Sequence, residues 1–372
     1  MAESTEKTLT VVAPRILSID ALRGFDMFWI MGGDTFFKVL LGLTGLSVAP
    51  ALVSQFEHVE WHGFRFYDLI FPLFLFLVGC VLPYSLEKHR ASPSDVYLRI
   101  ARRTLMLFLL GLVCNRILDF QFSELRVAGV LQRIGICYGI AALICVHLHV
   151  RGQVIVLVSI LFGYWAIMAW VPVPGGVAGD FSPEGNLAGY IDRQFLPGTI
   201  KEEYYGFGDN EGLLSTIPAI GTVLIGALAG AWLKSSVGPW RKVGGLVAVG
   251  LTVLVFGQVW GTVFPINKIL WTSSFVLVAG GWSLLLLALF YALIDVVGWK
   301  KWAFFWIVIG ANAITIFIVP RFIDFPQMAE YFLTGVANLA GDWRQLILVA
   351  GSLVAKWLFL WFLYRQRIFL RL

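Results

Sequence analysis

The sequence has few charged residues. Asp, Glu, Lys and Arg make up 14% of its 372 residues, whereas hydrophobic residues make up 59%. A soluble globular domain carries about 25% charged residues, so the composition excludes an ordinary soluble protein and indicates a polytopic membrane protein. The net charge of +5 does not indicate nucleic-acid binding, because the basic residues are sorted by predicted membrane side.

Other common features are missing as well. The four cysteines all lie in apolar runs and include no C-x-x-C pair, so we predict reduced packing residues and no disulfide or cysteine-bound metal. Residues 1–14 are polar and lack the apolar core of a cleavable signal peptide, so no cleavable signal peptide is predicted. They are predicted to form a cytoplasmic tail by the distribution of basic residues. No repeat, low-complexity segment or domain boundary is visible, so residues 15–372 are predicted to form one transmembrane domain.

Long apolar runs predict an all-α membrane protein with about ten spans, since each span needs about 20 mostly apolar residues. The segment 322–340 is interrupted by Pro326 and by charges, and it is predicted to lie at the membrane interface. The predicted spans lie near residues 22–46, 67–86, 98–118, 127–147, 151–171, 212–234, 241–261, 272–294, 302–320 and 343–364.

The basic residues predict the orientation. Most of the 28 Lys and Arg residues fall in segments that share one side if the N-terminus is cytoplasmic, as the positive-inside rule requires. Both termini are therefore predicted to be cytoplasmic, in a multi-pass protein of the inner membrane. The long, acid-rich loop 172–211 is predicted to face outward.

Several polar residues fall within predicted spans, where an ionisable group is costly and is by default a functional hypothesis. They are Asp34, Arg133, Asn312 and Lys356. An Asp–Arg pair that only locks two helices together is the alternative for Asp34 and Arg133. Asp34 follows two glycines, which permit close approach of another backbone.

The segment before the second span contains His58 and His62, four residues apart and close to Glu60. Two histidines at this spacing occur in the zinc motif H-E-x-x-H, but here the Glu is misplaced and Gly63 follows at once. No third ligand is obvious, so no metal is expected. A belt of His and Trp at the membrane interface is the alternative.

Arg99, Arg102 and Arg103 are spaced to share one helix face at the cytoplasmic start of the third span. Two interpretations stay open for them. They could anchor the span at the cytoplasmic surface, or they could form a cradle for phosphate groups, which arginine binds in a bidentate manner.

Eight motifs together resemble the heparan-α-glucosaminide N-acetyltransferase family, and they occur here in the family's order. They are RILSIDALRGFD (15–26), HVEWHGFRFYDLIFPLFLFLVG (58–79), VAGVLQRIGICY (127–138), WVPVPG (170–175), GYIDRQFLPG (189–198), DNEGLLSTIPAI (209–220), PINKILWTSSFVL (265–277) and GANAITIF (310–317).

The resemblance implies transfer of acetyl from cytosolic acetyl-CoA to the amine of a glucosamine-type sugar at the outer face. The family's active-site His falls on His58. The partner Asn of the animal enzyme aligns with Asp34, and this departure puts the partner's role in doubt. On this resemblance, the chain is expected to correspond to the animal enzyme without its extra N-terminal luminal domain and span.

These considerations assign roles to ten residues. His58 is predicted to be the general base, oriented by Asp34 as in a hydrolytic triad. The other assignments are Arg102, Arg103, Arg133 and Asn312 for acetyl-CoA, and Trp61, Asp68, Asp192 and Lys268 for the amino-sugar acceptor. The lipid bilayer is the expected surrounding, no nucleic acid is expected, and a homodimer is one assembly open to the chain.

Two alternatives belong to other classes of function. A secondary transporter for amino sugars would use Asp34 and Arg133 in a proton relay. An acyltransferase of the same architecture would act on cell-wall glycan. An acetyl-His intermediate and direct attack by the amine are both open, and we favour direct attack because the enzyme then mainly positions two reactants.

Overall fold

The computed structural model describes residues 16–87, 93–202 and 205–370, and these residues form helices and two isolated β-bridges but no strand. The predicted all-α class is confirmed. The tail predicted at residues 1–14 lies outside the described residues. The four cysteines are free thiols, and three of them are buried. The single domain predicted for 15–372 stays a prediction.

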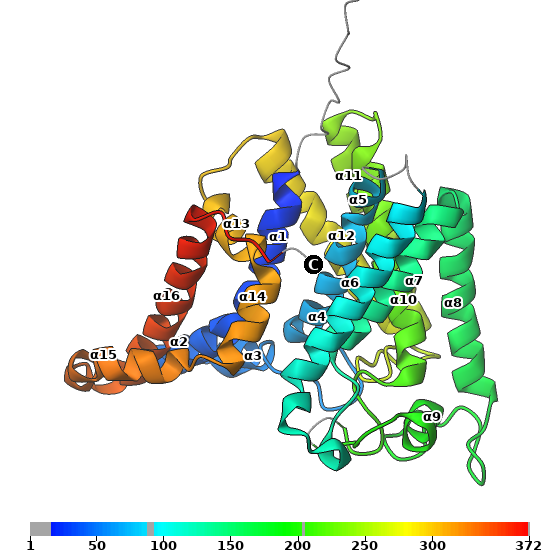
Figure 1. Cartoon of the computed structure of the whole chain (residues 1–372), viewed down its shortest axis with the longest axis horizontal. Coiled ribbons are helices and arrows are strands. Elements are labelled where there is room, and N and C mark those ends of the chain that lie inside the picture. Colours follow the sequence, from blue (N-terminus) through cyan, green and yellow to red (C-terminus); the bar gives the residue numbers. More distant parts are fainter. Residues whose placement is uncertain (1–15, 88–92, 203–204, 371–372) are drawn as a thin grey trace, which may run out of the picture.

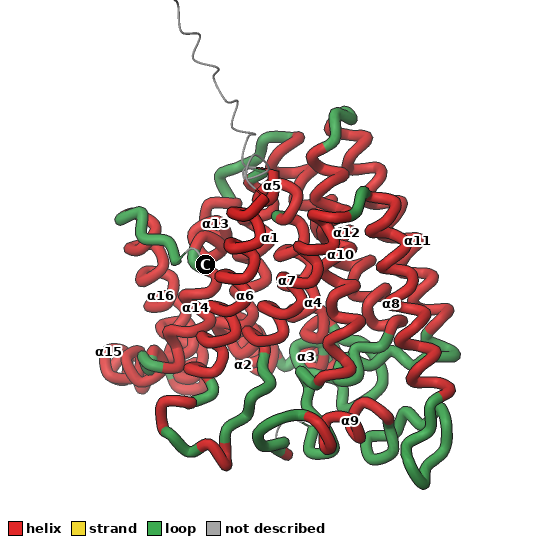
Figure 2. The backbone as a smooth tube through the Cα atoms, turned by 45° about the vertical axis from the view of Figure 1, so that its right-hand side comes forward, coloured by secondary structure: helices red, strands yellow, loops and turns green. Residues whose placement is uncertain are grey.

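The helices stand side by side in a bundle, with α9 and long loops at its lower end and with α15 and α16 to one side (Figures 1 and 2). The α-helices are α1 Leu17–Phe28, α2 Asp34–Thr44, α3 Ala49–Ser54, α4 Ile70–Cys80, α5 Leu82–Glu87, α6 Pro93–Cys114, α7 Val130–His147, α8 Val150–Trp170, α9 Leu187–Phe195, α10 Leu213–Lys234, α11 Pro239–Trp260, α12 Ser273–Tyr291, α13 Ala303–Ala311, α14 Ala313–Ile318, α15 Phe325–Leu339 and α16 Arg344–Arg365.

Seven helical segments in the described part of the chain are long and apolar enough to cross a membrane, and an eighth is formed if the bent pair α13–α14 counts as one span. The chain is thus a polytopic membrane protein. This number is lower than the ten spans that the sequence predicts. The two predicted spans that do not qualify are 22–46 and 98–118.

The first of these is divided by a break at Gly32. This glycine has a φ of 120° within a π-helical turn, Trp29–Gly33, that separates α1 from α2. A glycine adopts such a backbone angle without strain. The ammonium of Lys356 donates a hydrogen bond of 2.7 Å to the carbonyl of Met31 at the break. Lys356, predicted as a functional residue, therefore binds the backbone at this break, where a buried ammonium needs an acceptor.

The other segment is a continuous helix of 22 residues, α6, but its first half carries several arginines. Arg102 is exposed and Arg103 is half-buried. Charged side chains at this depth are costly in hydrocarbon, so this half of α6 is unlike an ordinary apolar span. The predicted boundary at residue 98 falls inside the helix, which begins at Pro93.

Helix α4 lies close against α10 through glycines. A Cβ atom at Gly79 would be 2.0 Å from the carbonyl oxygen of Val223, and one at Gly226 would be 1.9 Å from that of Phe76. Small residues of this kind allow the backbones of two membrane helices to approach closely. The contact fixes α4, and with it the short 3₁₀ turn η2, Phe66–Leu69, that comes directly before α4.

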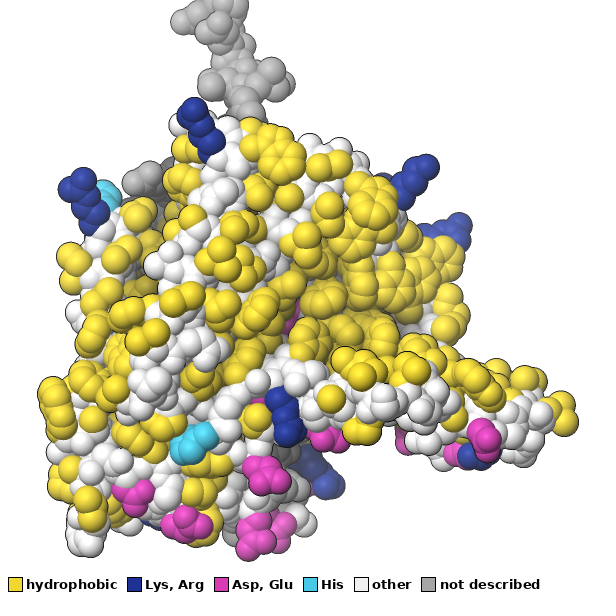
Figure 3. All heavy atoms as spheres, turned by 180° about the vertical axis from the view of Figure 1, so that it is seen from behind, with side chains coloured by type: hydrophobic (Ala, Val, Ile, Leu, Met, Phe, Trp, Pro, Cys, Tyr) yellow, Lys and Arg dark blue, Asp and Glu magenta, His cyan; other side chains and the backbone are white. Residues whose placement is uncertain are grey.

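Helix α15 occupies the predicted interfacial segment and carries exposed apolar side chains, among them Tyr331, Phe332 and Leu339. On the face shown in Figure 3, hydrophobic side chains cover the middle, and most of the acidic side chains gather along the lower edge beside a few basic ones. An amphipathic helix suits a membrane surface. The interfacial location of 322–340 and the homodimer stay predictions.

Candidate active site

The imidazole of His58 is held by a buried carboxylate. Its Nδ1 lies 2.7 Å from Oδ1 of Asp68, whose side chain is fully buried, whereas the His58 side chain is 51% exposed. The other oxygen of Asp68 accepts backbone hydrogen bonds from Arg65 (3.1 Å) and Val59 (3.4 Å). The carboxylate thus folds the loop back onto the start of η2 and orients the imidazole at the same time.

Lys268 completes a group of three side chains. Its Nζ lies 3.0 Å from Nδ1 and 3.3 Å from Nε2 of His58, and 3.6 Å from Oδ1 of Asp68. Burial lowers the pKa of Lys268, while the carboxylates of Asp68 and Glu211 oppose the shift. An imidazole, a carboxylate and an amine therefore meet at one exposed edge.

The His58 loop is fixed by its neighbours along the backbone. Gly63, with a φ of 128°, donates its N–H to the carbonyl of Ile266 at 2.8 Å. Nδ2 of Asn267 lies 3.4 Å from Nδ1 of His62, and burial lowers the pKa of His62. His62 therefore holds the loop against residues 265–272, and it has no place in the group around His58.

Trp61, predicted to bind the acceptor, also holds this loop. Its indole N–H donates to the carbonyl of Phe181 at 2.7 Å, and its ring lies 5.0 Å from that of Tyr205. These contacts join the His58 loop to the long loop 172–211. Trp61 thus lies at the boundary between the two loops.

Asp34 does not contact His58. Its carboxylate forms an ion pair of 3.3 Å with Lys38 on the same helix. Lys38 lies 5.8 Å from the ring of Tyr67, and that ring is 4.8 Å from the imidazole of His58. The prediction that Asp34 orients the base is corrected, because Asp68, assigned to the acceptor from sequence, holds Nδ1 instead.

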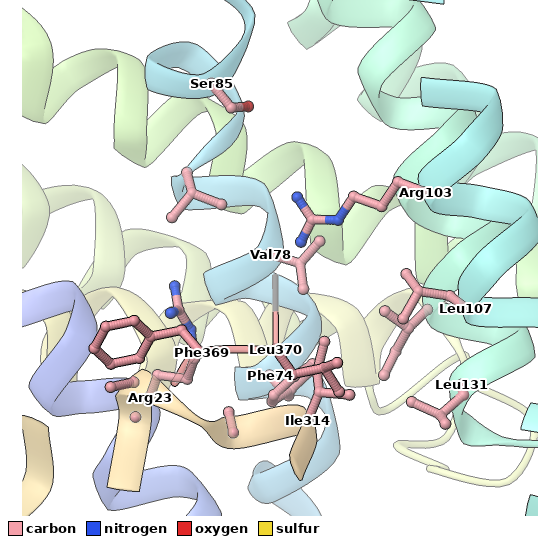
Figure 4. Close-up of a pocket in the computed structure, with 15 residues that line it drawn as sticks. Arg23, Phe74, Val78, Ser85, Arg103, Leu107, Leu131, Ile314, Phe369 and Leu370 are labelled. Carbon is pink, nitrogen blue, oxygen red and sulfur yellow. The ribbon is translucent and has the colours of Figure 1, made fainter. Parts of the chain in front are cut away.

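A cavity of about 460 Å³ lies between α1, α4, α6, α7 and α14 (Figure 4). Arg23 and Arg103 both line it, along with apolar side chains such as Phe74 and Leu131. The guanidinium of Arg103 lies 4.4 Å from the ring of Tyr138, and its Nε has no hydrogen-bond partner within the described part of the chain. The cavity is therefore apolar with two cationic groups.

Helix α4 connects this cavity with the His58 group. Phe74 lines the cavity and comes six residues after Asp68, which corresponds to roughly 10 Å along the helix. Between them, Phe71 packs against Trp271 with ring centroids 5.2 Å apart. A second, smaller cavity of about 130 Å³ shares Leu131 with the first and is lined by Glu211. The two cavities therefore lie on either side of Leu131, one in the bundle and the other beside Glu211.

A family model described as "Domain of unknown function (DUF5009)" matches residues 15–124. Human heparan-alpha-glucosaminide N-acetyltransferase is 26% identical over 370 residues, which cover 83% of this chain and 53% of the human protein. The mouse enzyme of the same name is 25% identical over 323 residues, or 71% of this chain and 48% of the mouse protein.

The chain is a distant relative of heparan-alpha-glucosaminide N-acetyltransferase. The resemblance drawn from the motifs is confirmed. The chain spans about half the length of the curated relatives it matches. Among the residues that the structure describes, no three His, Cys, Asp or Glu side chains are grouped so that they could hold a metal ion.

Four residues of this relative of the N-acetyltransferase were predicted to bind acetyl-CoA, and they do not all line the same cavity. Arg103 lines the larger cavity and Arg102 does not. Arg133 is 1% exposed, donates to the hydroxyl of Ser215 and lies 5.0 Å from the ring of Trp271. Arg133 therefore joins α7 to α10, and it is not among the residues that line the larger cavity.

Asn312 binds the end of the chain. The residue forms the bend between α13 and α14. Its amide donates to the carbonyl of Ile368 at 3.1 Å and accepts from the N–H of Leu370 at 3.3 Å. Phe369 and Leu370 then line the larger cavity (Figure 4). Asn312 therefore holds the segment that lines the cavity, and it does not line the cavity itself.

Asp192, assigned to the acceptor, is 2% exposed. Its carboxylate accepts backbone hydrogen bonds from Asp209 (3.1 Å) and Leu213 (2.8 Å), and burial raises its pKa to about 6. It thus fixes α9 to the start of α10. Sequence reasoning missed the neighbouring ion pairs of Arg126 with Asp209 and Glu211, both 2.5 Å. The only signal was that these acids belong to the motif DNEGLLSTIPAI.

Proposed function

We propose that the protein is an acyltransferase that moves acetyl from acetyl-CoA to the amine of a glucosamine-type sugar, with His58 as general base. The observation that carries the proposal is the exposed imidazole whose Nδ1 is held 2.7 Å from the buried carboxylate of Asp68. The distant relationship to an N-acetyltransferase supports the same reaction. Among the side chains at this edge, imidazole is suited to proton transfer near neutral pH.

In the proposed reaction the amine nitrogen attacks the thioester carbon, and the C–S bond breaks. Nε2 of His58 takes a proton from the amine and passes it to the departing sulfur, so the products are the N-acetyl sugar and CoA thiol. Asp68 keeps the proton of His58 on Nδ1 and stabilises the imidazolium that forms, as the carboxylate of a hydrolytic triad does.

The two substrates are proposed to arrive from opposite sides. The larger cavity, with Arg23 and Arg103, suits the polyanionic head and thin arm of acetyl-CoA from the cytosol, because arginine pairs with phosphate. The acidic lower edge (Figure 3) suits a cationic amino sugar from outside. Cytoplasmic termini and an inner-membrane location follow from this proposal and from the positive-inside rule.

Substitution at Arg103 is expected to weaken acetyl-CoA binding more than the same substitution at its neighbour. Arg103→Gln removes a cation that lines the cavity, whereas Arg102→Gln changes an exposed side chain outside it. Removing one charge-assisted contact should raise the Kd about tenfold or more. Equilibrium binding at several salt concentrations measures this, and salt should weaken wild-type binding. If both variants bind acetyl-CoA with the wild-type affinity, the two arginines only anchor the helix at the cytoplasmic surface, and the proposed binding role is wrong.

Direct attack predicts that the enzyme needs both substrates bound together. Wild-type protein should therefore give no exchange of label between CoA and acetyl-CoA when the acceptor is absent, because no acetyl-enzyme forms. Incubation with labelled CoA and mass analysis of His58 measure this. Acetyl on His58, formed from acetyl-CoA alone at a rate that matches turnover, would favour the covalent route.

A further inference from the structure

Lys268 places a cationic group at the edge of the imidazole where the reacting atoms must meet. Its Nζ is 3.3 Å from Nε2 of His58, the nitrogen that Asp68 leaves available. The Lys268 side chain is 20% exposed and the carboxylate of Asp68 is fully buried. The amine thus faces the exposed side of the group while the carboxylate lies beneath it.

We propose that Lys268 is a catalytic residue that donates a hydrogen bond to the thioester carbonyl oxygen as negative charge develops on it. This inference rests on the proposed function. It assigns a hydrogen-bond donor to the thioester carbonyl oxygen, for which the proposed reaction names no other donor. The residue was assigned from sequence to acceptor binding, so the proposal gives it a different role.

The distances permit this contact. A sugar amine that gives its proton to Nε2 lies about 3 Å from it, and the thioester carbon lies about 3–3.5 Å from that amine in a reactive geometry. An arrangement that satisfies these distances can also place the carbonyl oxygen against an ammonium that is itself 3.3 Å from Nε2. An ammonium has three N–H donors, so pairing with Asp68 leaves others for the oxygen.

Other groups face Lys268 and His58 from several elements. The ring of Tyr67 lies against the imidazole, and Lys38 lies on the ring of Tyr67. Arg65 donates a hydrogen bond to the backbone carbonyl of His58 and lies 4.0 Å from the carboxylate of Glu57. The charge of Glu211 acts on Lys268.

Lys268→Met tests the proposal, since it keeps the length of the side chain and removes the charge. We expect kcat to fall by about 10²–10³-fold, as when one oxyanion donor is removed from other enzymes, with the KM for acetyl-CoA little changed. Lys268→Arg should recover part of the rate.

Lys38→Met is the matched control, because Lys38 pairs with Asp34 at the same end of the molecule and should give a normal rate. A Lys268→Met variant that turns over normally, or one that changes only the KM for the sugar, overturns the proposal. A wild-type protein that forms no N-acetyl sugar overturns the proposed function itself. Active wild type with an unaffected variant overturns only the role of Lys268.

Discussion

Asp68→Asn is expected to lower kcat for acetyl transfer by about 10²–10⁴-fold, because the corresponding change in a hydrolytic triad leaves the imidazole in the wrong tautomer. In the wild type, the carboxylate can only accept the Nδ1 proton of His58 at 2.7 Å, which leaves Nε2 to act as base. An amide can donate to Nδ1 instead, and the proton then occupies Nε2. Steady-state rates at saturating acetyl-CoA and sugar measure the loss.

The matched control is Asp34→Asn. Asp34 pairs with Lys38, so its neutralisation should change the rate by no more than a few fold. Each variant neutralises one carboxylate, and only the carboxylate of Asp68 contacts the imidazole. Loss of activity in Asp34→Asn with normal activity in Asp68→Asn would return the orienting role to Asp34.

Folding must be separated from chemistry in this comparison. Asp68 is fully buried and accepts two backbone N–H groups, so the Asn variant should also lose stability. A partner left unsatisfied in a buried position costs about 1–3 kcal/mol. The Tm of the detergent-solubilised variant measures this, and the rate is then expressed per folded molecule.

His58→Ala is expected to remove detectable transfer while acetyl-CoA still binds. Loss of a general base lowers the rate by about 10²–10⁴-fold, and the larger cavity, whose lining does not include His58, should keep its affinity for acetyl-CoA. Because the His58 side chain is 51% exposed, its removal should hardly affect folding. Single-turnover assays and equilibrium binding on the same preparation measure both properties.

His62→Ala provides the comparison for His58→Ala. His62 lies in the same loop and faces Asn267, so its loss should lower the rate only mildly. Loss of both transfer and acetyl-CoA binding in His58→Ala would contradict the separation of base and cofactor cavity. Equal loss of transfer in both His variants would indicate a collapsed loop.

The sequence predicted those features that depend on local pattern. Apolar runs gave the all-α membrane class, and the motif around His58 singled out the exposed imidazole. Gly32 and Gly33 were noted beside Asp34, but the resulting break in the helix was not predicted. A run of apolar residues looks continuous in sequence even where one glycine changes the backbone direction, and this accounts for the predicted span 22–46 that does not qualify.

Partners that come from distant segments could not be predicted in the same way. Asp34 was paired with His58 by alignment with a family residue, yet the loop closes on Asp68, ten residues after His58. Lys268 reaches the imidazole from a position 210 residues away. Arg102 and Arg103 look equivalent as neighbours, and only the packing of α6 decides that Arg103 lines the cavity.

The central claim is acetyl transfer from acetyl-CoA to an amino sugar, and product formation by the purified protein tests it most directly. The protein in detergent, with no membrane gradient, is incubated with acetyl-labelled acetyl-CoA and glucosamine beside the His58→Ala variant. The account predicts labelled N-acetylglucosamine and free CoA thiol in equal amounts with the wild type, and neither with the variant. Wild-type protein that binds glucosamine but forms no acetylated product, whether from glucosamine or from a cell-wall glycan, would contradict the account and favour a transporter.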